Sequence, residues 1–390
     1  MKRSSVLFIV AILVIGIILS GCGTSTSTPT TPAQTTPVQT TPTSPSSTTP
    51  ASTTPSSTTP ASTASANLTG AGATFPAPLY TKWFDVYNQQ TNIKINYQAV
   101  GSGAGIQQIT AGTVDFGASD AIMTADQQSK AEAAGGPVLH IPMTSGATAI
   151  VINLQGISSG QLKLSGTVMA NIYLKKILKW NDPAIAALNP GLNLPDQQIA
   201  VVHRSDGSGT TFIFTNYLSK VSEDWKNGPG NATSVNWPGD IGGQGSAGVA
   251  GQVQQTPGAI GYVELAYAIQ NKIPWASIQN SSGKYVEPSL AATTAAATGI
   301  TLPDDMKVMI TNSSNADSYP ICGFTWILAF VNQKDQVKGQ TLAKFLWWAI
   351  HDGQQYTAPL NYGALSSDAV KKAEAEILTI SFQGKPLVTP

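Results

Sequence analysis

Charged side chains are scarce in this sequence. Asp, Glu, Lys and Arg make up 11% of its 390 residues, well below the roughly 25% usual for soluble domains. The 21 basic and 21 acidic residues also cancel, so no net charge attracts nucleic acid or an anionic membrane surface. Any anion that this protein binds must therefore be held by local chemistry, and we expect no nucleic-acid partner.

Cysteine and histidine are also rare. The two cysteines are Cys22 and Cys322, and the three histidines, His140, His203 and His351, are far apart. No group of residues has the spacing of a metal site, so we expect no metal and no cofactor. A lone cysteine before an apolar run, as at Cys322, is typical of a buried small hydrophobic residue rather than of a nucleophile.

Residues 1–22 have the pattern of a secretory signal peptide. "MKR" is basic, and Val6 to Leu19 is an unbroken apolar run, shorter than the about 20 residues that a spanning helix needs. "LSGC" then resembles a lipobox, where prokaryotic lipoproteins are cut before a cysteine that becomes acylated, here Cys22. The alternative is an uncleaved membrane anchor. Both interpretations place the rest of the chain outside the cell and attached to a membrane.

Residues 23–66 form a segment rich in Thr, Ser and Pro, without a charged or aromatic side chain. Such a segment buries too little apolar surface to offset the entropy of ordering it. It therefore predicts a disordered stalk. The folded part is expected from Asn67 to Pro390, which is long enough for two domains.

A unit of strand, Gly/Ser turn and helix recurs in the folded part. Residues 93–100 alternate apolar and polar side chains, as a half-buried strand does, and run into "GSGAG" and a helical pattern. Residues 199–204 form a second expected strand, before "SDGSGTTF" and another helix. In a third unit, Leu68 ends a short strand and a helix begins near Pro76. This alternation predicts an α/β fold with ligands beyond the carboxyl ends of the strands.

The turn "HRSDGSGTTF" suits an anion. A helix N-terminus carries free N–H groups and a partial positive charge. Gly209 lets the backbone approach a ligand, Ser208 and Thr210 add hydroxyl groups, and Arg204 can add a fork of donors. A helix capped by Asp206 or Ser208 explains the stretch equally well on its own.

Similar turns occur at "GATF" (residues 72–75) and "GSG" (residues 101–103). Because several anion-suited turns occur in one chain, the sequence favours one oxyanion that is held on many sides.

Asp120 is a carboxylate among these turns, at the end of the short strand expected within residues 113–122. An ionised carboxylate only accepts hydrogen bonds, so it would accept one from a P–OH group and repel an oxyanion without a hydrogen. A buried acceptor left unpaired costs about 1–3 kcal/mol, which is enough to discriminate between ligands. This argument favours phosphate over sulfate. The alternative roles for Asp120 are a strand-end cap and an ion pair.

Long blocks of the folded part resemble the periplasmic phosphate-binding proteins that feed the phosphate ABC importer. The blocks are "LTGAGATFPAPLYTKW", "YQAVGSGAGIQQI", "TVDFGASDA", "NIYLKKILKWND", "LNPGLNLPDQQIAVVHRSDGSGTTFIFTNYL" and "PGAIGYVELAYA". The resemblance covers residues 67–390, and the signal, lipobox and stalk fit the lipoprotein form of the family.

The resemblance implies a type II periplasmic-binding-protein fold, with two α/β lobes joined by two crossing strands and the ligand cleft between them. The crossing segments we expect are residues 147–153 and 324–330. Lobe 1 would then consist of residues 67–146 and 323–390, and lobe 2 of residues 147–322.

The family's phosphate-binding residues fall on matching positions of both lobes. On lobe 1 the resemblance implies Ala73, Thr74, Phe75, Ser102 and Asp120. On lobe 2 it implies Arg204, Ser208, Gly209 and Thr210. Asp206 resembles the aspartate that pairs with the binding arginine. The chain departs from some relatives at Gly103, where they have a second serine, and at His203, where they have a second arginine.

The sequence thus predicts a lipid-anchored, monomeric receptor on the outer face of the cytoplasmic membrane. It would bind inorganic phosphate and deliver it to the permease subunits of an ABC importer, without acting as an enzyme. The alternatives are a binder of another tetrahedral oxyanion, such as sulfate, and a phosphatase or phosphate sensor on the same scaffold.

Two further motifs carry less information. "GISSG" (residues 156–160) fits the pattern of a nucleophile elbow but lacks a supporting Asp and His. The Gly-rich residues 242–251 line the cleft or form a plain loop.

Overall fold

Helices and strands alternate along the folded chain. The computed structural model describes residues 66–239 and 241–389, which belong to one compact unit. The predicted signal peptide, Cys22 and the stalk up to residue 65 lie outside the described residues.

The strands have these bounds: β1 (Leu68–Gly72), β2 (Ile95–Ala99), β3 (Phe116–Ser119), β4 (Val138–Ile152), β5 (Lys163–Leu164), β6 (Ala200–Arg204), β7 (Ile241–Gly243), β8 (Ala259–Glu264), β9 (Ser277–Gln279), β10 (Tyr285–Val286), β11 (Cys322–Phe330), β12 (Ser381–Phe382) and β13 (Lys385–Pro386). The α-helices are α1 (Ala77–Thr91), α2 (Ser102–Ala111), α3 (Ala125–Gly135), α4 (Gly166–Tyr173), α5 (Pro183–Ala186), α6 (Gly209–Val221), α7 (Glu223–Asn227), α8 (Gly245–Gln255), α9 (Leu265–Gln270), α10 (Leu290–Ala297), α11 (Gln336–Ile350) and α12 (Ser367–Leu378). Two short 3₁₀ helices, η1 (Asp352–Tyr356) and η2 (Ala358–Leu360), follow α11.

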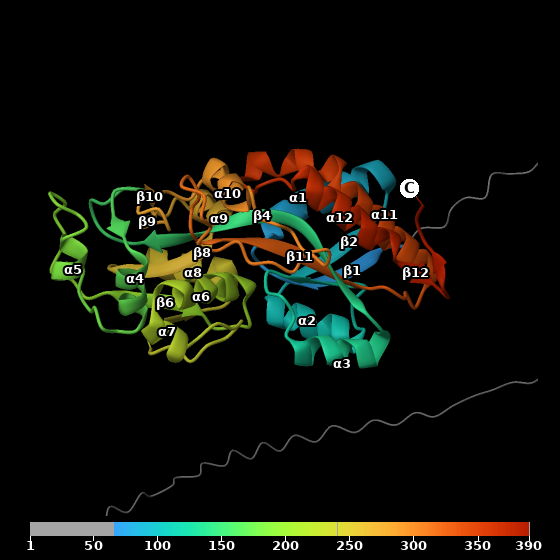
Figure 1. Ribbon diagram of the computed structural model, residues 1–390, viewed down its shortest axis with the longest axis horizontal. Coiled ribbons are helices and arrows are strands. Elements are labelled where there is room, and N and C mark those ends of the chain that lie inside the picture. The colour runs from blue at the N-terminus through green and yellow to red at the C-terminus, as the bar shows by residue number, and fades with distance from the viewer. Residues whose placement is uncertain (1–65, 240, 390) are drawn as a thin grey trace, which may run out of the picture. The chain divides into compact units, whose positions relative to one another are not determined.

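The main sheet of the described residues has eight strands in the order β2-β1-β3-β11-β4-β8-β6-β7. At one end β1 runs parallel to β2 and β3, and at the other end β6 runs parallel to β7 and β8. In the middle β11 and β4 pair antiparallel with each other. Figure 1 shows α10, α11 and α12 on one side of the sheet and α2, α3, α6 and α7 on the other. The predicted α/β class is confirmed.

The long strand β4 belongs to both halves of this sheet. It pairs with β11 as far as Ala147 and with β8 from Thr148 onward. Figure 1 shows β4 and β11 running side by side between the green-to-yellow elements and the blue and red ones. The first expected crossing segment is therefore part of a strand that begins at Val138 rather than at Ala147. We keep the names lobe 1 and lobe 2 for the two ranges defined above.

Two local predictions need correction. Leu68 begins β1 instead of ending it, because this strand continues to Gly72 in register with β2. The Gly-rich residues 242–251 are not a plain loop, because they supply the end of β7 and the first turns of α8. They form a further unit of strand, glycine turn and helix.

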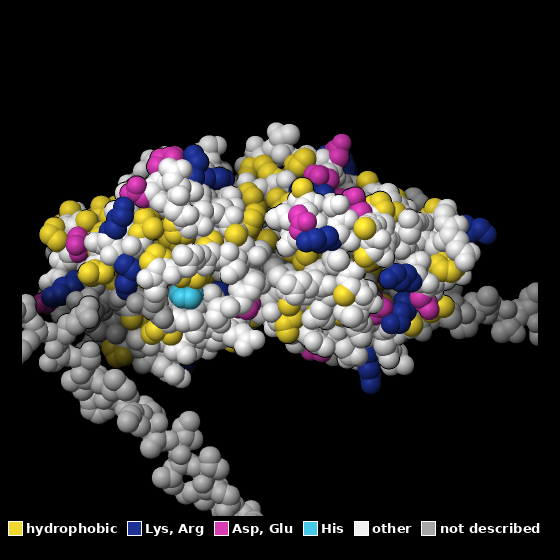
Figure 2. Space-filling model, turned by 90° about the horizontal axis from the view of Figure 1, so that it is seen from below, with side chains coloured by type: hydrophobic (Ala, Val, Ile, Leu, Met, Phe, Trp, Pro, Cys, Tyr) yellow, Lys and Arg dark blue, Asp and Glu magenta, His cyan; other side chains and the backbone are white. Residues whose placement is uncertain are grey.

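Charges lie in small mixed groups on the face that Figure 2 shows, where no large area carries one sign. Many of the cations have an anionic neighbour, as in the exposed pairs of Lys130 with Asp126 and Lys176 with Asp224. Among the residues that the structure describes, no helix is both long and apolar enough to span a membrane.

Helix α2 lies directly on the strands that lead into the candidate site. A Cβ atom at Gly105, within this helix, would lie 2.6 Å from the Gly72 Cα atom and 2.6 Å from the Ala118 carbonyl oxygen. Backbone therefore packs on backbone at this point, and no side chain fits between the helix and the sheet.

We therefore expect Gly105→Ala to lower the free energy of unfolding by about 1–3 kcal/mol, because the added methyl group overpacks this contact. Gly251→Ala is the matched control, since its Cβ atom meets nothing within 4 Å in α8. That variant should gain about 0.5–1 kcal/mol from helix propensity. Urea denaturation measures both, and a gain of stability in Gly105→Ala would contradict the packing described here.

Candidate functional site

The loop between β1 and α1 forms one wall of the candidate site. Its three consecutive carbonyl groups each accept a hydrogen bond of 2.7 Å from a tyrosine hydroxyl group. The pairs are Tyr97 with Ala73, Tyr267 with Thr74, and Tyr362 with Phe75. Since the C=O and the following N–H of a trans peptide point in opposite directions, these bonds also fix the directions of the Thr74 and Phe75 N–H groups.

The N–H groups of this loop are not equally available. Ala73 donates its N–H to the Ala118 carbonyl group (2.9 Å), so it cannot donate to a ligand as the family resemblance implied. Thr74 and Phe75 have N–H groups without a partner in the described part of the chain, at the start of α1. Thr74 is buried, and its hydroxyl group faces Ser246 of α8.

Ser102, the first residue of α2, joins three segments of the site. Its hydroxyl oxygen accepts the N–H of Asp120 (3.1 Å) and the N–H of Gly209 (3.1 Å). A hydroxyl oxygen has two lone pairs, so both are occupied and its proton is left to donate. Ser102 is fully buried and ties the end of β3 to the start of α6.

Asp120 follows β3 directly, as predicted, and its side chain is buried. Its Oδ1 atom accepts the Thr325 hydroxyl group at 2.7 Å, while its Oδ2 atom has no protein partner in the described residues. Burial raises the pKa of Asp120 to about 7, although the hydroxyl groups of Thr325 and Ser102 and the charge of Arg204 act against this. Asp120 therefore presents one unpaired acceptor oxygen to the site.

Arg204 ends β6 and brings the positive charge. It is almost fully buried, and its Nε and Nη2 atoms donate to the two carboxylate oxygens of Asp206 at 2.7 and 2.5 Å. Its Nη1 atom donates to the Thr210 hydroxyl oxygen (3.4 Å). A guanidinium group has five N–H donors, so two remain for a ligand.

Asp206 holds this arginine in place. Although its partial burial acts to raise its pKa, the hydrogen bonds and charge of Arg204 and the Gly245 N–H (3.0 Å) hold the pKa of Asp206 below its usual value. It stays ionised and moderates the charge of Arg204. The pairing that the family resemblance implied is thus present in the structure.

The start of α6 supplies the third wall. Ser208 caps the helix by accepting the Thr211 N–H (3.0 Å), so the capping role that the sequence left open is real. Gly209 donates its N–H to Ser102, which leaves the Thr210 N–H and hydroxyl groups as donors at this helix end. Glycine is required at 209, because a Cβ atom there would lie 2.5 Å from Asp120 Oδ2.

The two departures from relatives have physical reasons. A Cβ atom at Gly103 would lie 3.0 Å from the Gly207 Cα atom, so a serine would crowd the contact between the two loops. His203 stacks on Trp237 with ring centroids 5.0 Å apart and lies on the opposite side of β6 from Arg204. Its side chain therefore does not enter the site.

Sequence reasoning missed three residues of this region, Ser246, Tyr267 and Glu264. Ser246 and Tyr267 hold Thr74, and Glu264 ends β8. The signals were present: Ser246 follows a glycine at a helix start, and Glu264 is the acidic last residue of an apolar strand, much as Asp120 directly follows one.

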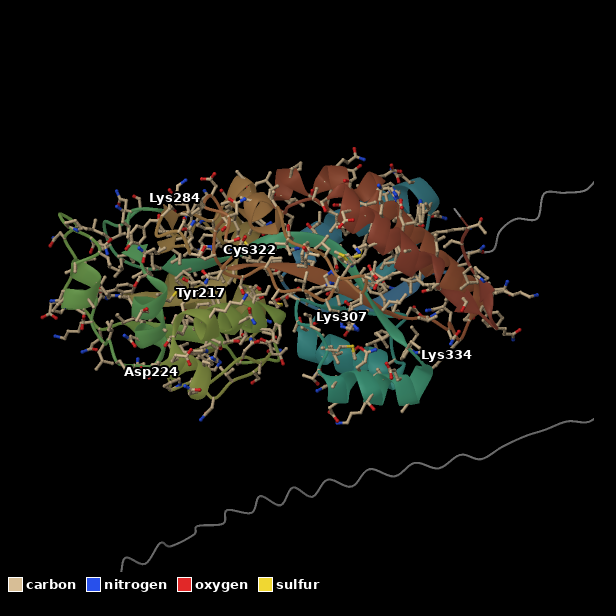
Figure 3. The ribbon with its side chains drawn as sticks, viewed as in Figure 1. Tyr217, Asp224, Lys284, Lys307, Cys322 and Lys334 are labelled. Carbon is tan, nitrogen blue, oxygen red and sulfur yellow. The ribbon has the colours of Figure 1, made fainter. Side chains whose placement is uncertain are left out.

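Cys322 is not part of the site. It lies at the start of β11 in the protein interior, and Figure 3 labels it. Burial raises the pKa of its thiol group to about 12, so this cysteine is not an activated nucleophile. No group of three or more His, Cys, Asp or Glu side chains that could hold a metal ion occurs among the described residues.

The candidate site combines several donors with the unpaired acceptor oxygen of Asp120. The donors are the N–H groups of two helix starts, the hydroxyl groups of Thr74, Ser102 and Thr210, and a buried guanidinium group. The unpaired Oδ2 atom of Asp120 lies beside Gly209 and Ser102. Such a site suits a small oxyanion that carries a proton of its own.

This fold and site place the chain in a known class. A family model described as a PBP superfamily domain matches residues 56–352, so the chain belongs to the PBP superfamily. The solved structure of a high-affinity periplasmic phosphate-binding protein, PfluDING, superposes with a TM-score of 0.66 at 20% identity. The match covers 82% of this chain and 96% of that one, and the predicted type II fold is confirmed.

Within this class, the chain is similar in sequence to phosphate-binding proteins named PstS. The PstS of Pasteurella multocida is 47% identical over 79% of this chain and 89% of its own length. The PstS of Xylella fastidiosa (strain Temecula1) is 46% identical over 79% of this chain and 84% of its own length. The chain is therefore a member of the PstS family of phosphate-binding proteins.

Glu264 is a second buried carboxyl group, joined to the loop between β1 and α1 through the Tyr362 hydroxyl group. Its Oε2 atom lies 2.8 Å from the Ala266 N–H, which donates to it, and 3.0 Å from the Tyr362 hydroxyl group, while Oε1 has no partner in the described residues. Burial raises the pKa of Glu264 well above its usual range, and the charge of Asp120 raises this pKa further. The contacts with Ala266 and Tyr362 act to lower it.

Because the folded state keeps this proton while the unfolded state loses it near pH 4.3, the stability that the proton provides is lost as the pH rises toward the folded-state pKa. We expect the free energy of unfolding of the wild type to fall by up to about 1.4 kcal/mol per pH unit more steeply than that of Glu264→Gln. Urea denaturation between pH 4.5 and pH 8 measures both slopes. Titration of Asp120 contributes to the slope in both proteins, so the difference between the slopes reports on Glu264. Equal slopes would mean that Glu264 is ionised in the folded state.

Proposed function

We propose that this protein binds inorganic phosphate between its two lobes and delivers it to the membrane permease of an ABC importer. The observation that carries the proposal is the unpaired Oδ2 atom of Asp120, a buried acceptor of lobe 1 that lies beside Gly209 of lobe 2 and the Ser102 hydroxyl group. A phosphate ion with one P–OH group satisfies the donors and the acceptor together.

The names of similar proteins support the choice of ligand and of transport. The relatives from Pasteurella multocida and Xylella fastidiosa are named phosphate-binding proteins. A protein of Clostridium perfringens that is assigned as a phosphate ABC transporter substrate-binding protein, solved with bound phosphate, shares the fold at 16% identity and a TM-score of 0.57.

In this proposal the nine residues implied by the family resemblance contribute different chemical groups to the site. N–H groups come from Thr74, Phe75 and Thr210. Hydroxyl protons come from Thr74, Ser102 and Thr210, and Arg204 offers its free N–H donors. Ser208 and Gly209 shape the start of α6, and Ala73 shapes the loop opposite, since its own N–H is already used.

We further propose that residues 67–146 with 323–390, and residues 147–322, close on the ligand as two bodies. The two ranges touch in the structure: Gly103 donates its N–H to the Gly207 carbonyl group (2.8 Å), and Gly209 donates to Ser102. Phosphate contacts both lobes only when they are closed, so its binding favours the closed state.

The cellular setting is part of the proposal. The signal pattern, the lipobox at Cys22 and the stalk of residues 23–66 support a protein held by a lipid on the outer face of the cytoplasmic membrane. We propose that it acts there as a monomer. These residues lie outside the described part of the chain.

A sulfate-binding protein is the alternative within the same class, and Asp120 argues against it. Ionised sulfate has no hydrogen to donate, so the Oδ2 atom of an ionised Asp120 would face a negatively charged oxygen atom without a hydrogen bond between them. A phosphatase or a phosphate sensor is the alternative from other classes. The described residues offer no cluster of metal-binding side chains near the site, and the nucleophile-elbow pattern at residues 156–160 lies in a turn between β4 and β5.

Titration calorimetry at pH 8 tests the ligand and the role of Asp120 together. The wild type should bind phosphate 1:1 and bind sulfate negligibly. Asp120→Asn should reduce the ratio of phosphate to sulfate affinity by a factor of ten to several hundred. In the wild type, bound sulfate leaves the Asp120 carboxylate unpaired, which costs about 1–3 kcal/mol, whereas the amide of the variant can donate a hydrogen bond to sulfate.

Asp115→Asn is the matched control for this experiment. Asp115 lies on the same lobe and pairs with Lys338 (2.9 Å), away from the site. This variant should keep the selectivity of the wild type. Comparable affinities of the wild type for phosphate and sulfate would contradict the proposed function, and an unchanged ratio in Asp120→Asn would assign Asp120 a purely structural role.

A further inference from the structure

Thr74, one of the proposed phosphate ligands on lobe 1, is held by two residues of lobe 2. The Ser246 N–H donates to the Thr74 hydroxyl oxygen at 3.2 Å, and the two hydroxyl oxygens lie 3.0 Å apart. Tyr267 donates its hydroxyl proton to the Thr74 carbonyl oxygen at 2.7 Å. Both Thr74 and Ser246 are buried, so water does not replace these contacts while the lobes are together.

The hydroxyl group of Thr74 has one proton and two lone pairs. One lone pair accepts the Ser246 N–H. In the contact between the two hydroxyl groups either oxygen can be the donor. When Thr74 gives its proton to an anion, only Ser246 can donate in this contact, and the Thr74 oxygen then accepts two hydrogen bonds and donates one. Ser246 therefore determines whether Thr74 acts as a donor to the ligand without losing a bond.

Ser102 shows the same arrangement in a completed form. Its oxygen accepts two N–H groups, one from Asp120 of its own lobe and one from Gly209 of lobe 2. Its proton is thereby directed to an acceptor in the site. At both hydroxyl groups, the partner that completes the set comes from the opposite lobe.

We propose that Ser246 is a positioning residue that turns the Thr74 hydroxyl group into an obligate donor when the lobes close on phosphate. The inference rests on the proposed function and deepens it, since it assigns to residue 246 a part in affinity without direct contact with the ligand. Closure then does more than bring two walls together: it fixes the direction in which a ligand hydroxyl group donates. A chain of hydrogen bonds from Ser246 through Thr74 to the anion also strengthens each bond by polarisation.

The position of Ser246 in the fold makes this role a local consequence of the chain. Gly245, with φ at +67°, turns the backbone from β7 into α8, and its N–H donates to Asp206. The same turn thus anchors the carboxylate that holds Arg204 and presents Ser246 to Thr74. The Gly-rich residues 242–251 support both sides of the proposed phosphate site.

Phosphate titration of the full chain tests this inference through a double-mutant cycle. Ser246→Ala removes the hydroxyl group and keeps the N–H, and it should weaken phosphate binding about 3- to 10-fold, the effect of one lost hydrogen bond in a buried network. In the Thr74→Val background, Ser246→Ala should weaken binding less than twofold, because the Thr74 hydroxyl group through which Ser246 acts on the ligand is absent. Ser246→Thr, which restores a hydroxyl group, should bind nearly as tightly as the wild type.

Ser277→Ala is the matched control, because Ser277 is a buried serine of lobe 2 whose hydroxyl group donates to the Gly160 carbonyl group (2.9 Å), away from the site. It should leave phosphate affinity unchanged. Wild-type affinity in Ser246→Ala, or an equal loss with and without the Thr74 hydroxyl group, would overturn the inference and leave phosphate binding intact. Failure of the wild type to bind phosphate would overturn the proposed function, and this inference with it.

Discussion

The oxygen atom of Ser102 is the point on which the site depends. It accepts one N–H from the residue that follows β3 and one from the first residue of α6, at 3.1 Å each. These two bonds fix Asp120 in lobe 1, bring the start of α6 in lobe 2 against it, and leave the serine proton free to donate. The close approach is possible because residue 209 is glycine, whose Cα atom lies beside the Asp120 carboxylate. Affinity and selectivity therefore meet at one junction between the lobes.

The electrostatics of the site follow from burial rather than from net charge. Arg204 is the one cation that we assign to the site among the described residues, and Asp206 neutralises much of its charge through two hydrogen bonds. In the proposed function, the remaining attraction for an anion comes from helix starts and from hydroxyl groups, of which Ser102 already has both lone pairs filled. In the proposed function, such neutral donors hold an oxyanion without favouring every anion equally, and the unpaired oxygen of Asp120 then selects for a ligand with a proton. A chain with as few charges as this one can build such a site.

The parts of the site that the sequence predicted are local ones. Asp120 and Arg204 follow or end apolar strands, and Ser208 to Thr210 begin a helix, so adjacent residues carry the signal for each. Contacts between distant residues gave no such signal. Ser246 lies 172 positions from Thr74, and a Gly-rich stretch fits a loop as well as a helix start. The sequence also does not show which N–H groups donate to acceptors within the protein. The family resemblance therefore implies the Ala73 N–H group as a ligand donor, although it donates to the Ala118 carbonyl group in the structure.

The central claim is that the ligand must bring a proton to Asp120, or Asp120 must supply one. Since burial raises the pKa of this carboxyl group to about 7, a protonated Asp120 can donate to sulfate at low pH, whereas an ionised one repels it. The most direct measurement is sulfate affinity as a function of pH. We expect the sulfate Kd to be nearly constant below pH 6 and to rise about tenfold per pH unit above pH 7. A sulfate Kd that does not change between pH 5 and pH 9, or that falls as the pH rises, would contradict it.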